Sequence, residues 1–265
     1  MSSISHDSPT PSHDVAPFEA SPGEQLTRAQ TTSSSPPPPP EAAPLTAVEK
    51  FLTIFVPIFL VITLLGIWMC IRQLNTWTEW VVFLLALPTA WAMADVITGI
   101  THWALDTYGS EETPYLGYVL IKPFRMHHEY PTYMVQFDDA PTIANSAAGA
   151  TPLQLGALYV STFGGWWSVL AMLFMIAMFG AVATNLFHKW AHMDAPPRIA
   201  AYLQKLHIIL TVKHHDTHHA APHKSAYCIT NGWMNPILDA IGFWRIMERG
   251  IALFGFYPHD EQPSA

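Results

Sequence analysis

The chain has few charged residues and almost no cysteine. Only 12% of its 265 residues are Asp, Glu, Lys or Arg, whereas half are apolar, a balance typical of a membrane protein. Its basic residues form no stripe along the sequence, and this argues against a nucleic-acid partner. The two cysteines, Cys70 and Cys228, have neither metal-binding nor redox spacing. We therefore expect both to be packing residues.

Residues 1–45 lack the long apolar run of a signal peptide. They are rich in Ser, Thr, Pro and Ala and include an unbroken proline run from Pro36 to Pro40. Such a segment buries too little apolar surface to offset its ordering entropy, so we predict a disordered tail. Its only basic residue, Arg28, is outnumbered by acids, which argues against a transit peptide. We expect a membrane domain over residues 46–253 and a C-terminal tail over residues 254–265.

Apolar runs predict about four membrane crossings. Residues 51–71 contain no charge and are long enough to cross a bilayer, and residues 80–103 form a second run. Residues 152–163 and 166–187 form a pair hinged at Gly164–Gly165, and the first member of this pair is short. The sequence therefore predicts an all-α, polytopic membrane helical bundle with additional amphipathic helices.

Four crossings place every histidine and all basic residues except Arg72 on one side of the membrane. The positive-inside rule makes that side cytoplasmic. We therefore expect a multi-pass protein with a cytoplasmic active face, in the endoplasmic reticulum of a eukaryote or the inner membrane of a bacterium. Cys70 and Cys228 fall on opposite faces in this arrangement, so no disulfide is expected.

Eleven histidines in four places are candidate metal ligands. Imidazole is the commonest metal ligand near neutral pH, and so many rings at one membrane face would be costly to desolvate unless something binds them. Spacings of four residues also put pairs of these histidines on the same helical face. The candidates are His102, His127, His128, His188, His192, His207, His214, His215, His218, His219 and His223.

Two acids accompany these histidines. Asp95, His102 and Asp106 share one helical face, and we take both acids as candidate catalytic residues. Asp194 and Asp216 either hold imidazole N–H groups or are solvated surface acids. So many nitrogen and carboxylate ligands exceed one zinc site and suit two oxygen-reactive ions. A zinc-dependent lipid hydrolase is the enzymatic alternative. A metal transporter is disfavoured, because only one acid lies inside a span.

Five motifs resemble the Kua-type family of histidine-box membrane lipid desaturases. They read DVITGITHWALDTYG, PFRMHHEYP, NLFHKWAH, LHIILTVKHHDTHHAAPH and YCITNGWMNPILDAIGFWR. That family contains plasmanylethanolamine desaturases and the plastid palmitate desaturases that act on phosphatidylglycerol. Histidine at positions 207, 214 and 223 resembles the residue pattern of the plasmanylethanolamine desaturases. Met126, Phe137 and Pro141 depart from its pattern, and they leave the exact lipid open.

The resemblance implies a plasmanylethanolamine desaturase, which would form the vinyl ether bond of plasmalogens from an ether phospholipid. It further implies two Fe ions, O2 as co-substrate and an external electron donor such as cytochrome b5 or a ferredoxin. Fatty-acyl desaturation near the headgroup is the alternative within the family. The amphipathic stretch 236–251 is expected to lie on the membrane or to pack as an ordinary helix. Lys189 and Lys205 either contact phosphates or anchor the interface.

Overall fold

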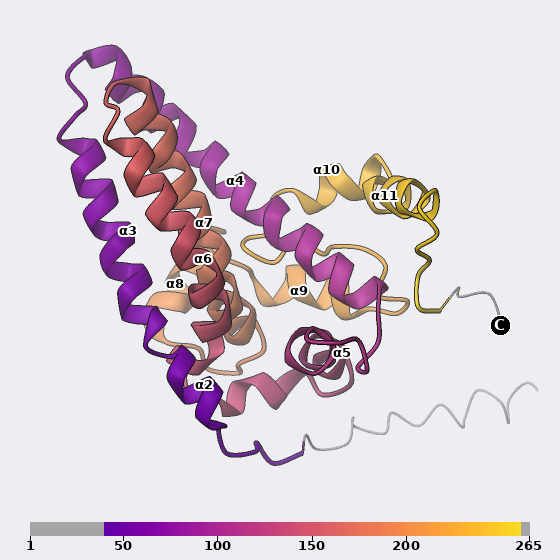
Figure 1. The fold of residues 1–265 in the computed structure, drawn as a ribbon. Helices are drawn as coiled ribbons and strands as arrows, with labels where there is room; N and C mark the ends of the chain where they lie inside the picture. Colours follow the sequence, from indigo (N-terminus) through magenta and orange to yellow (C-terminus); the bar gives the residue numbers. More distant parts are fainter. Residues whose placement is uncertain (1–39, 261–265) are drawn as a thin grey trace, which may run out of the picture. The chain divides into compact units, whose positions relative to one another are not determined.

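The computed structural model describes residues 40–260, which form helices and loops without a β-strand (Figure 1). The all-α prediction is therefore confirmed for this part of the chain. The predicted disordered tail lies outside the described residues up to position 39, as do the last five residues of the predicted C-terminal tail. In chain order the elements are α2 (Ala47–Leu52), α3 (Phe55–Ile71), α4 (Trp77–Thr107), the π-helix η1 (Gly117–Ile121), α5 (Lys122–Glu129), the 3-10 helix η2 (Pro131–Gln136), α6 (Asp139–Ser161), α7 (Trp166–Ala191), α8 (Arg198–Lys205), α9 (Val212–His219), α10 (Asn235–Ala240) and α11 (Phe243–Ala252).

Side-chain caps fix where two of these helices begin. Thr76 precedes α4, and its hydroxyl accepts a hydrogen bond from the backbone N–H of Glu79 at 3.2 Å. The Glu79 carboxylate in turn accepts the N–H of Thr76 at 3.0 Å. Thr46 and Glu49 form the same capping box at the start of α2. These reciprocal bonds satisfy backbone donors that the first turn of a helix leaves open.

Within residues 40–260, three helical segments are long and apolar enough to cross a membrane. They are Ala47–Ile71, Trp77–Thr107 and Trp166–Ala191. They contain three of the four apolar runs that predicted crossings, so these three are confirmed by length and composition. Their outward side chains remain exposed, as with Leu64 and Trp68 of α3, which is expected of a surface that faces lipid.

The fourth expected crossing differs from the prediction. Its apolar run lies within α6, which begins at Asp139 and lacks the apolar composition of the other three. Some polar residues of α6 face the protein: Gln154 is fully buried, and its amide donates to the hydroxyl of Thr63 at 2.7 Å and to the carbonyl of Met175 at 3.3 Å. Because α3 and α7 accept both hydrogen bonds of this amide N–H group, α6 forms the fourth long helix of the bundle without a fully apolar sequence.

Small residues let the long helices approach closely. A Cβ added to Gly180 of α7 would lie 2.8 Å from the Cβ of Ala94 in α4. A Cβ added to Gly66 of α3 would lie 2.5 Å from the side chain of Met175 in α7. Because glycine has no side chain, these two positions allow the helices to approach closely, as is common in membrane bundles.

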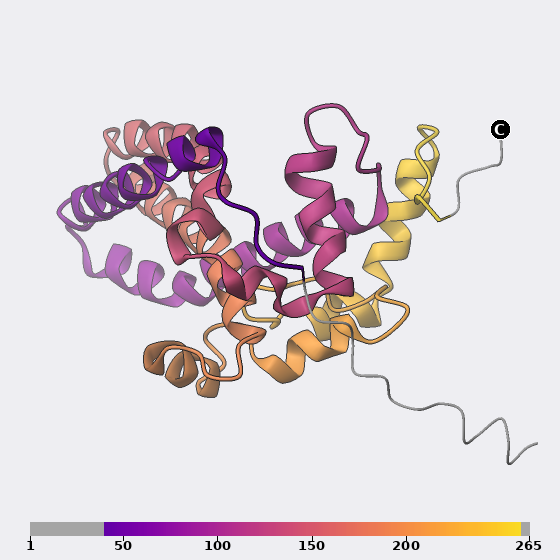
Figure 2. The ribbon, with the colours of Figure 1, turned by 90° about the horizontal axis from the view of Figure 1, so that it is seen from below.

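The C-terminal ends of α4 and α7 lie at the same end of the bundle (Figure 1). The short helices α5 and α9 are also found at this end, which Figure 2 shows from below. The connections between α3 and α4 and between α6 and α7 lie at the opposite end. The histidine-bearing segments therefore meet on one side of the bundle, as the sequence predicts.

The C-terminal amphipathic stretch forms two short helices rather than one. Gly242 lies between α10 and α11 and has a φ of 66°, a left-handed conformation that ends the first helix. α11 packs through Trp244, which is 4% exposed and contacts the ring of Tyr227. Cys70 and Cys228 are both buried and free, which confirms that no disulfide joins them.

Candidate metal centre

Four segments far apart in the sequence bring eight of the predicted histidines together. The end of α4, the helix α5, the end of α7 and the helix α9 supply them. The expected spacings work as predicted at two places: ring centroids lie 5.1 Å apart for His188 and His192, and 4.5 Å apart for His215 and His219. The eight histidines fall into two groups that share His127.

The first group combines α5, α7 and α9. Its closest atoms are ring nitrogens: Nε2 of His215 lies 2.7 Å from Nε2 of His192 and 2.9 Å from Nε2 of His219. A single proton between two rings satisfies only one such pair, so three converging nitrogens favour a bound cation. The group contains His127, His188, His192, His215 and His219.

The second group combines α4, α5 and α9 around a carboxylate. Oδ2 of Asp106 lies 3.2 Å from Nε2 of His102, 3.1 Å from that of His128 and 3.4 Å from that of His218. The side chain of Asp106 is only 10% exposed. The four histidines of this group are His102, His127, His128 and His218.

Backbone carbonyls fix the rings of the second group. Nδ1 of His102 donates to the carbonyl of Tyr227 at 3.1 Å, and Nδ1 of His218 donates to that of Ser225 at 2.8 Å. Nδ1 of His127 donates to the carbonyl of Phe124. Because a carbonyl only accepts, each Nδ1 carries the ring proton and each Nε2 presents a lone pair. Such hydrogen bonds orient imidazole ligands in metal sites.

The donor atoms fit two metal ions. Lone pairs on Nε2 of His102 and His218 point toward the anionic Asp106, an arrangement that is repulsive unless a cation lies between them. Among the described residues, buried Nε2 atoms of His127 and His188 have no hydrogen-bond partner. Ligands on one ion, each about 2.1 Å from it, lie at most about 4.2 Å apart. The donor atoms within each group lie within 4.8 Å of one another, close to that limit.

Burial favours the neutral form of four of these imidazoles. Burial lowers the pKa of His127 and His215 well below the ordinary value. Burial and neighbouring imidazoles lower the pKa of His192 to about 4 and that of His219 to about 2. A neutral ring has the free lone pair that metal coordination requires. Both groups can therefore hold a metal.

Three predicted ligands lie outside both groups. The ring centroid of His207 lies 6.4 Å from that of His214, and neither ring joins the eight. His223 is closer, with its ring centroid 4.8 Å from that of His128, and its Nδ1 donates to the carbonyl of His218 at 3.2 Å. The ligand roles of these three histidines remain predictions.

Asp95 binds backbone rather than imidazole. Its Oδ1 accepts the N–H groups of Thr230, Asn231 and Gly232 at 3.0, 3.0 and 3.1 Å. Its Oδ2 accepts the N–H of Met234 at 3.0 Å, and the residue is fully buried. The carboxylate therefore fastens the loop at residues 225–234 to α4, and the same loop supplies the carbonyls that orient the second group. A catalytic role for Asp95 remains a prediction without a contact to the histidines.

The structure also bears on the expected roles of Lys189 and of the acids Asp194 and Asp216. Lys189 is 5% exposed and pairs with Asp139 at 2.8 Å, so it links α7 to α6 and is not available to a lipid phosphate. Asp194 and Asp216 are exposed, and backbone carbonyls hold the imidazole N–H groups of the second group instead. Carbonyl partners of this kind have no signature in the amino-acid sequence.

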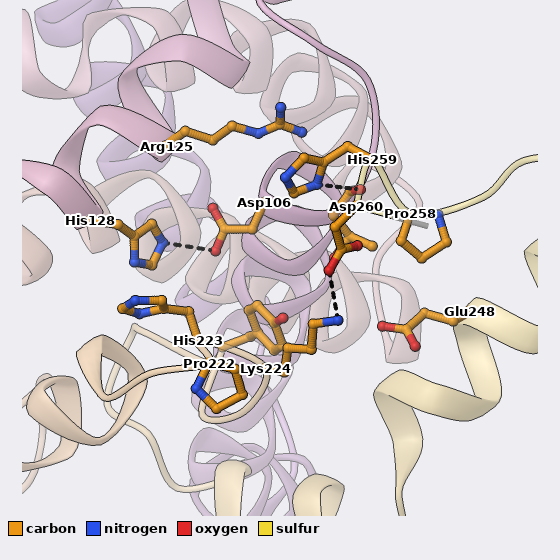
Figure 3. A pocket seen from close by; sticks show the side chains of 12 residues that line it. Asp106, Arg125, His128, Pro222, His223, Lys224, Glu248, Pro258, His259 and Asp260 are labelled. Carbon is orange, nitrogen blue, oxygen red and sulfur yellow. Dashed lines mark hydrogen bonds and ion pairs between the residues drawn. The ribbon is translucent and has the colours of Figure 1, made fainter. Parts of the chain in front are cut away.

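A polar cavity of about 350 Å³ opens beside the second group (Figure 3). Asp106 and His128 line one side of it, and Arg125, Lys224 and Glu248 line the rest. Sequence reasoning did not single out these last three residues as a site. The only available signal was Arg125 within the motif PFRMHHEYP.

The amino-acid sequence is similar to those of known proteins. The family model of the lipid desaturase domain matches residues 91–261, a range that holds all eleven candidate histidines. Plasmanylethanolamine desaturase of Myxococcus xanthus is 39% identical over 175 residues, which cover 66% of this chain and 61% of that protein. Plasmanylethanolamine desaturase 1 of Mus musculus is 35% identical over 182 residues, with 66% and 67% covered. Fatty acid desaturase 4, chloroplastic, of Arabidopsis thaliana is 32% identical over 171 residues, with 62% and 50% covered. No solved structure matches the chain.

Proposed function

This chain belongs to the lipid desaturase domain family, and on that premise we propose that it is a membrane-bound plasmanylethanolamine desaturase. The observation that carries the proposal is the pair of adjacent imidazole groups with Asp106 at the end of the membrane helices. The family match supports the class of chemistry, and the names of two relatives support the proposed substrate.

The proposed reaction removes one hydrogen from each of two adjacent carbons beside the ether oxygen. One O2, two electrons and two protons are consumed, and the products are one vinyl ether and two water molecules. Bound iron would supply the oxidising power, because no amino-acid side chain can oxidise an unactivated C–H bond. Electrons would come from a separate carrier such as cytochrome b5 or a ferredoxin.

The chain's own residues would hold two ions. We assign His188, His192, His215 and His219 to one, and His102, His128 and His218 with Asp106 to the other. His127 belongs to both groups and would bind one of the two ions. The carbonyls of Tyr227 and Ser225 would keep the rings of His102 and His218 in the ligating tautomer.

A second cavity supports a lipid chain as the substrate. It measures about 210 Å³ and lies between α4, α6 and α7, lined by apolar residues such as Leu153, Met178 and Val182. Phe124, which also lines it, packs edge-on against the ring of His102 with centroids 5.3 Å apart. An alkyl chain in this cavity would reach the metal centre from the membrane side. By the positive-inside rule the centre would face the cytoplasm, near the depth of the lipid headgroups.

Two measurements test this function. Purified protein supplied with plasmanylethanolamine, O2 and a reduced donor should release an acid-labile vinyl ether lipid, detected by mass spectrometry. Elemental analysis should give close to two irons per chain. A product desaturated in an acyl chain would favour the alternative named by the plant relative. One zinc per chain would contradict the oxidative chemistry and favour a lipid hydrolase.

A further inference from the structure

The polar cavity beside the second histidine group adjoins the metal centre. It lies at the C-terminal end of α4 and is enclosed by α5, α11, the loop around residue 223 and the segment 258–260 (Figure 3). Its volume of about 350 Å³ falls within the range of small-molecule sites. Asp106 and His128 form the wall toward the metal centre, so an occupant of the cavity adjoins the reacting position.

Two cations line the cavity. Nη2 of Arg125 donates to the carbonyls of Tyr108 and Gly109 at 3.1 and 2.9 Å, which fixes the guanidinium in place. The buried Nε of Arg125 has no hydrogen-bond partner in the described part of the chain. Lys224 reaches in from the opposite side (Figure 3) and pairs with Asp260 at 2.9 Å. That pair is about half exposed, so an anionic ligand can displace Asp260 at little cost.

Two acids balance these cations. The carboxylate of Glu248 points into the cavity (Figure 3), and its Oε1 accepts the indole N–H of Trp103 at 3.4 Å. Asp260 is the second acid. Asp106 belongs to the metal centre, so the charges left for a ligand are two positive and two negative. A balanced set of this kind suits a zwitterion better than an anion or a cation.

We propose that this cavity holds the phosphoethanolamine headgroup of the lipid, an inference that rests on the proposed function. Arg125 and Lys224 contact the phosphate, and Glu248 accepts hydrogen bonds from the ammonium group. The carbons to be oxidised adjoin the ether oxygen, only a few covalent bonds from the phosphate. Binding the headgroup here therefore brings those carbons to the wall formed by Asp106 and His128.

The lining also explains how other headgroups would be rejected. Choline has no N–H to donate to Glu248 and is usually held by several aromatic rings. Among the residues that line this cavity, Tyr227 is the only Phe, Tyr or Trp. A glycerol headgroup would leave Glu248 without a cation beside a charged phosphate, which is unfavourable.

The test measures lipid binding without turnover, so it is independent of the desaturation assay. Native mass spectrometry of the full, metal-loaded chain would compare bound phosphatidylethanolamine, phosphatidylcholine and phosphatidylglycerol. Wild-type protein should prefer phosphatidylethanolamine by on the order of tenfold, the effect of one charge-assisted hydrogen bond. Glu248→Gln should lose this preference. Glu112→Gln, the same change on an exposed loop outside the cavity, should keep it.

A second variant tests the phosphate assignment. The side chain of Lys224 is 52% exposed, so Lys224→Gln should fold normally and bind all three lipids more weakly by a similar factor. The proposal is wrong if wild type shows no preference, if Glu248→Gln retains it, or if Lys224→Gln binds like wild type. Soluble glycerophosphoethanolamine that binds as tightly as the lipid would assign the cavity to a soluble ligand instead. Vinyl ether formation without headgroup preference would refute this inference and leave the proposed function standing.

Discussion

Replacing Asp95 by alanine should unfold the loop that orients the second histidine group. The carboxylate accepts four backbone N–H groups at 3.0–3.1 Å, and the residue is fully buried. Each buried donor left without an acceptor costs about 1–3 kcal/mol, so the four together cost roughly 4–12 kcal/mol. This is comparable with the entire stability of a domain, roughly 5–15 kcal/mol. Asp95→Ala should therefore fail to accumulate as folded, metal-loaded protein.

The asparagine variant separates a structural role from a catalytic one. Asp95→Asn keeps one oxygen for three donors and loses the bond to Met234, at about 1–3 kcal/mol for the donor left open, so it should destabilise the protein less than Asp95→Ala. Thermal unfolding followed by tryptophan fluorescence, with metal content measured in parallel, would report the effect. Thr101→Ala, an exposed position on the same helix, is the control and should change little. An Asp95→Ala protein as stable as wild type would refute the role of this carboxylate as the anchor of the loop.

Two further substitutions test the metal centre and the bundle. His215→Ala should remove about one metal ion per chain, because Nε2 of His215 lies close to two ring nitrogens of the first group. His214→Ala is the control and should keep both ions, because His214 lies outside both groups. Equal metal content in the two variants would contradict the assignment. Gly180→Val should lower the unfolding temperature, since its Cβ would lie 2.8 Å from that of Ala94 and overpacking costs about 1–3 kcal/mol. Gly156→Ala meets nothing within 4 Å and should be tolerated, so an equal drop in both variants would argue against close contact of α4 and α7.

The long apolar helices could be predicted because they depend on local sequence. Apolar runs identified three of the long helices. The fourth was placed only in part, since α6 begins at Asp139 and the side-chain amide of Gln154 donates hydrogen bonds to other helices. Apolarity can be judged from a local stretch of sequence, whereas the hydrogen-bond partners of its polar groups lie on other helices and cannot. For the same reason, the break at Gly242 between α10 and α11 was not expected.

The candidate site was predicted as a set of residue types and not as an arrangement. The i,i+4 spacing correctly paired His215 with His219, because helix geometry fixes that distance. The same rule also paired His214 with His218, yet only His218 joins the two groups. Which face of α9 turns toward α4 and α7 depends on packing and on the loop that Asp95 holds.

The amino-acid sequence by itself determined the class of fold, the kind of ligand atom and the gathering of histidines at one end of the membrane helices. These follow from composition and from the fixed periodicity of a helix. Only the tertiary structure divided the histidines into two groups around Asp106, turned Asp95 into a backbone anchor and formed the polar cavity beside Arg125 and Glu248. Those features depend on contacts between different helices and loops, and some of these join residues more than a hundred positions apart, as between His102 and the carbonyl of Tyr227. Such contacts exist only once the helices have packed.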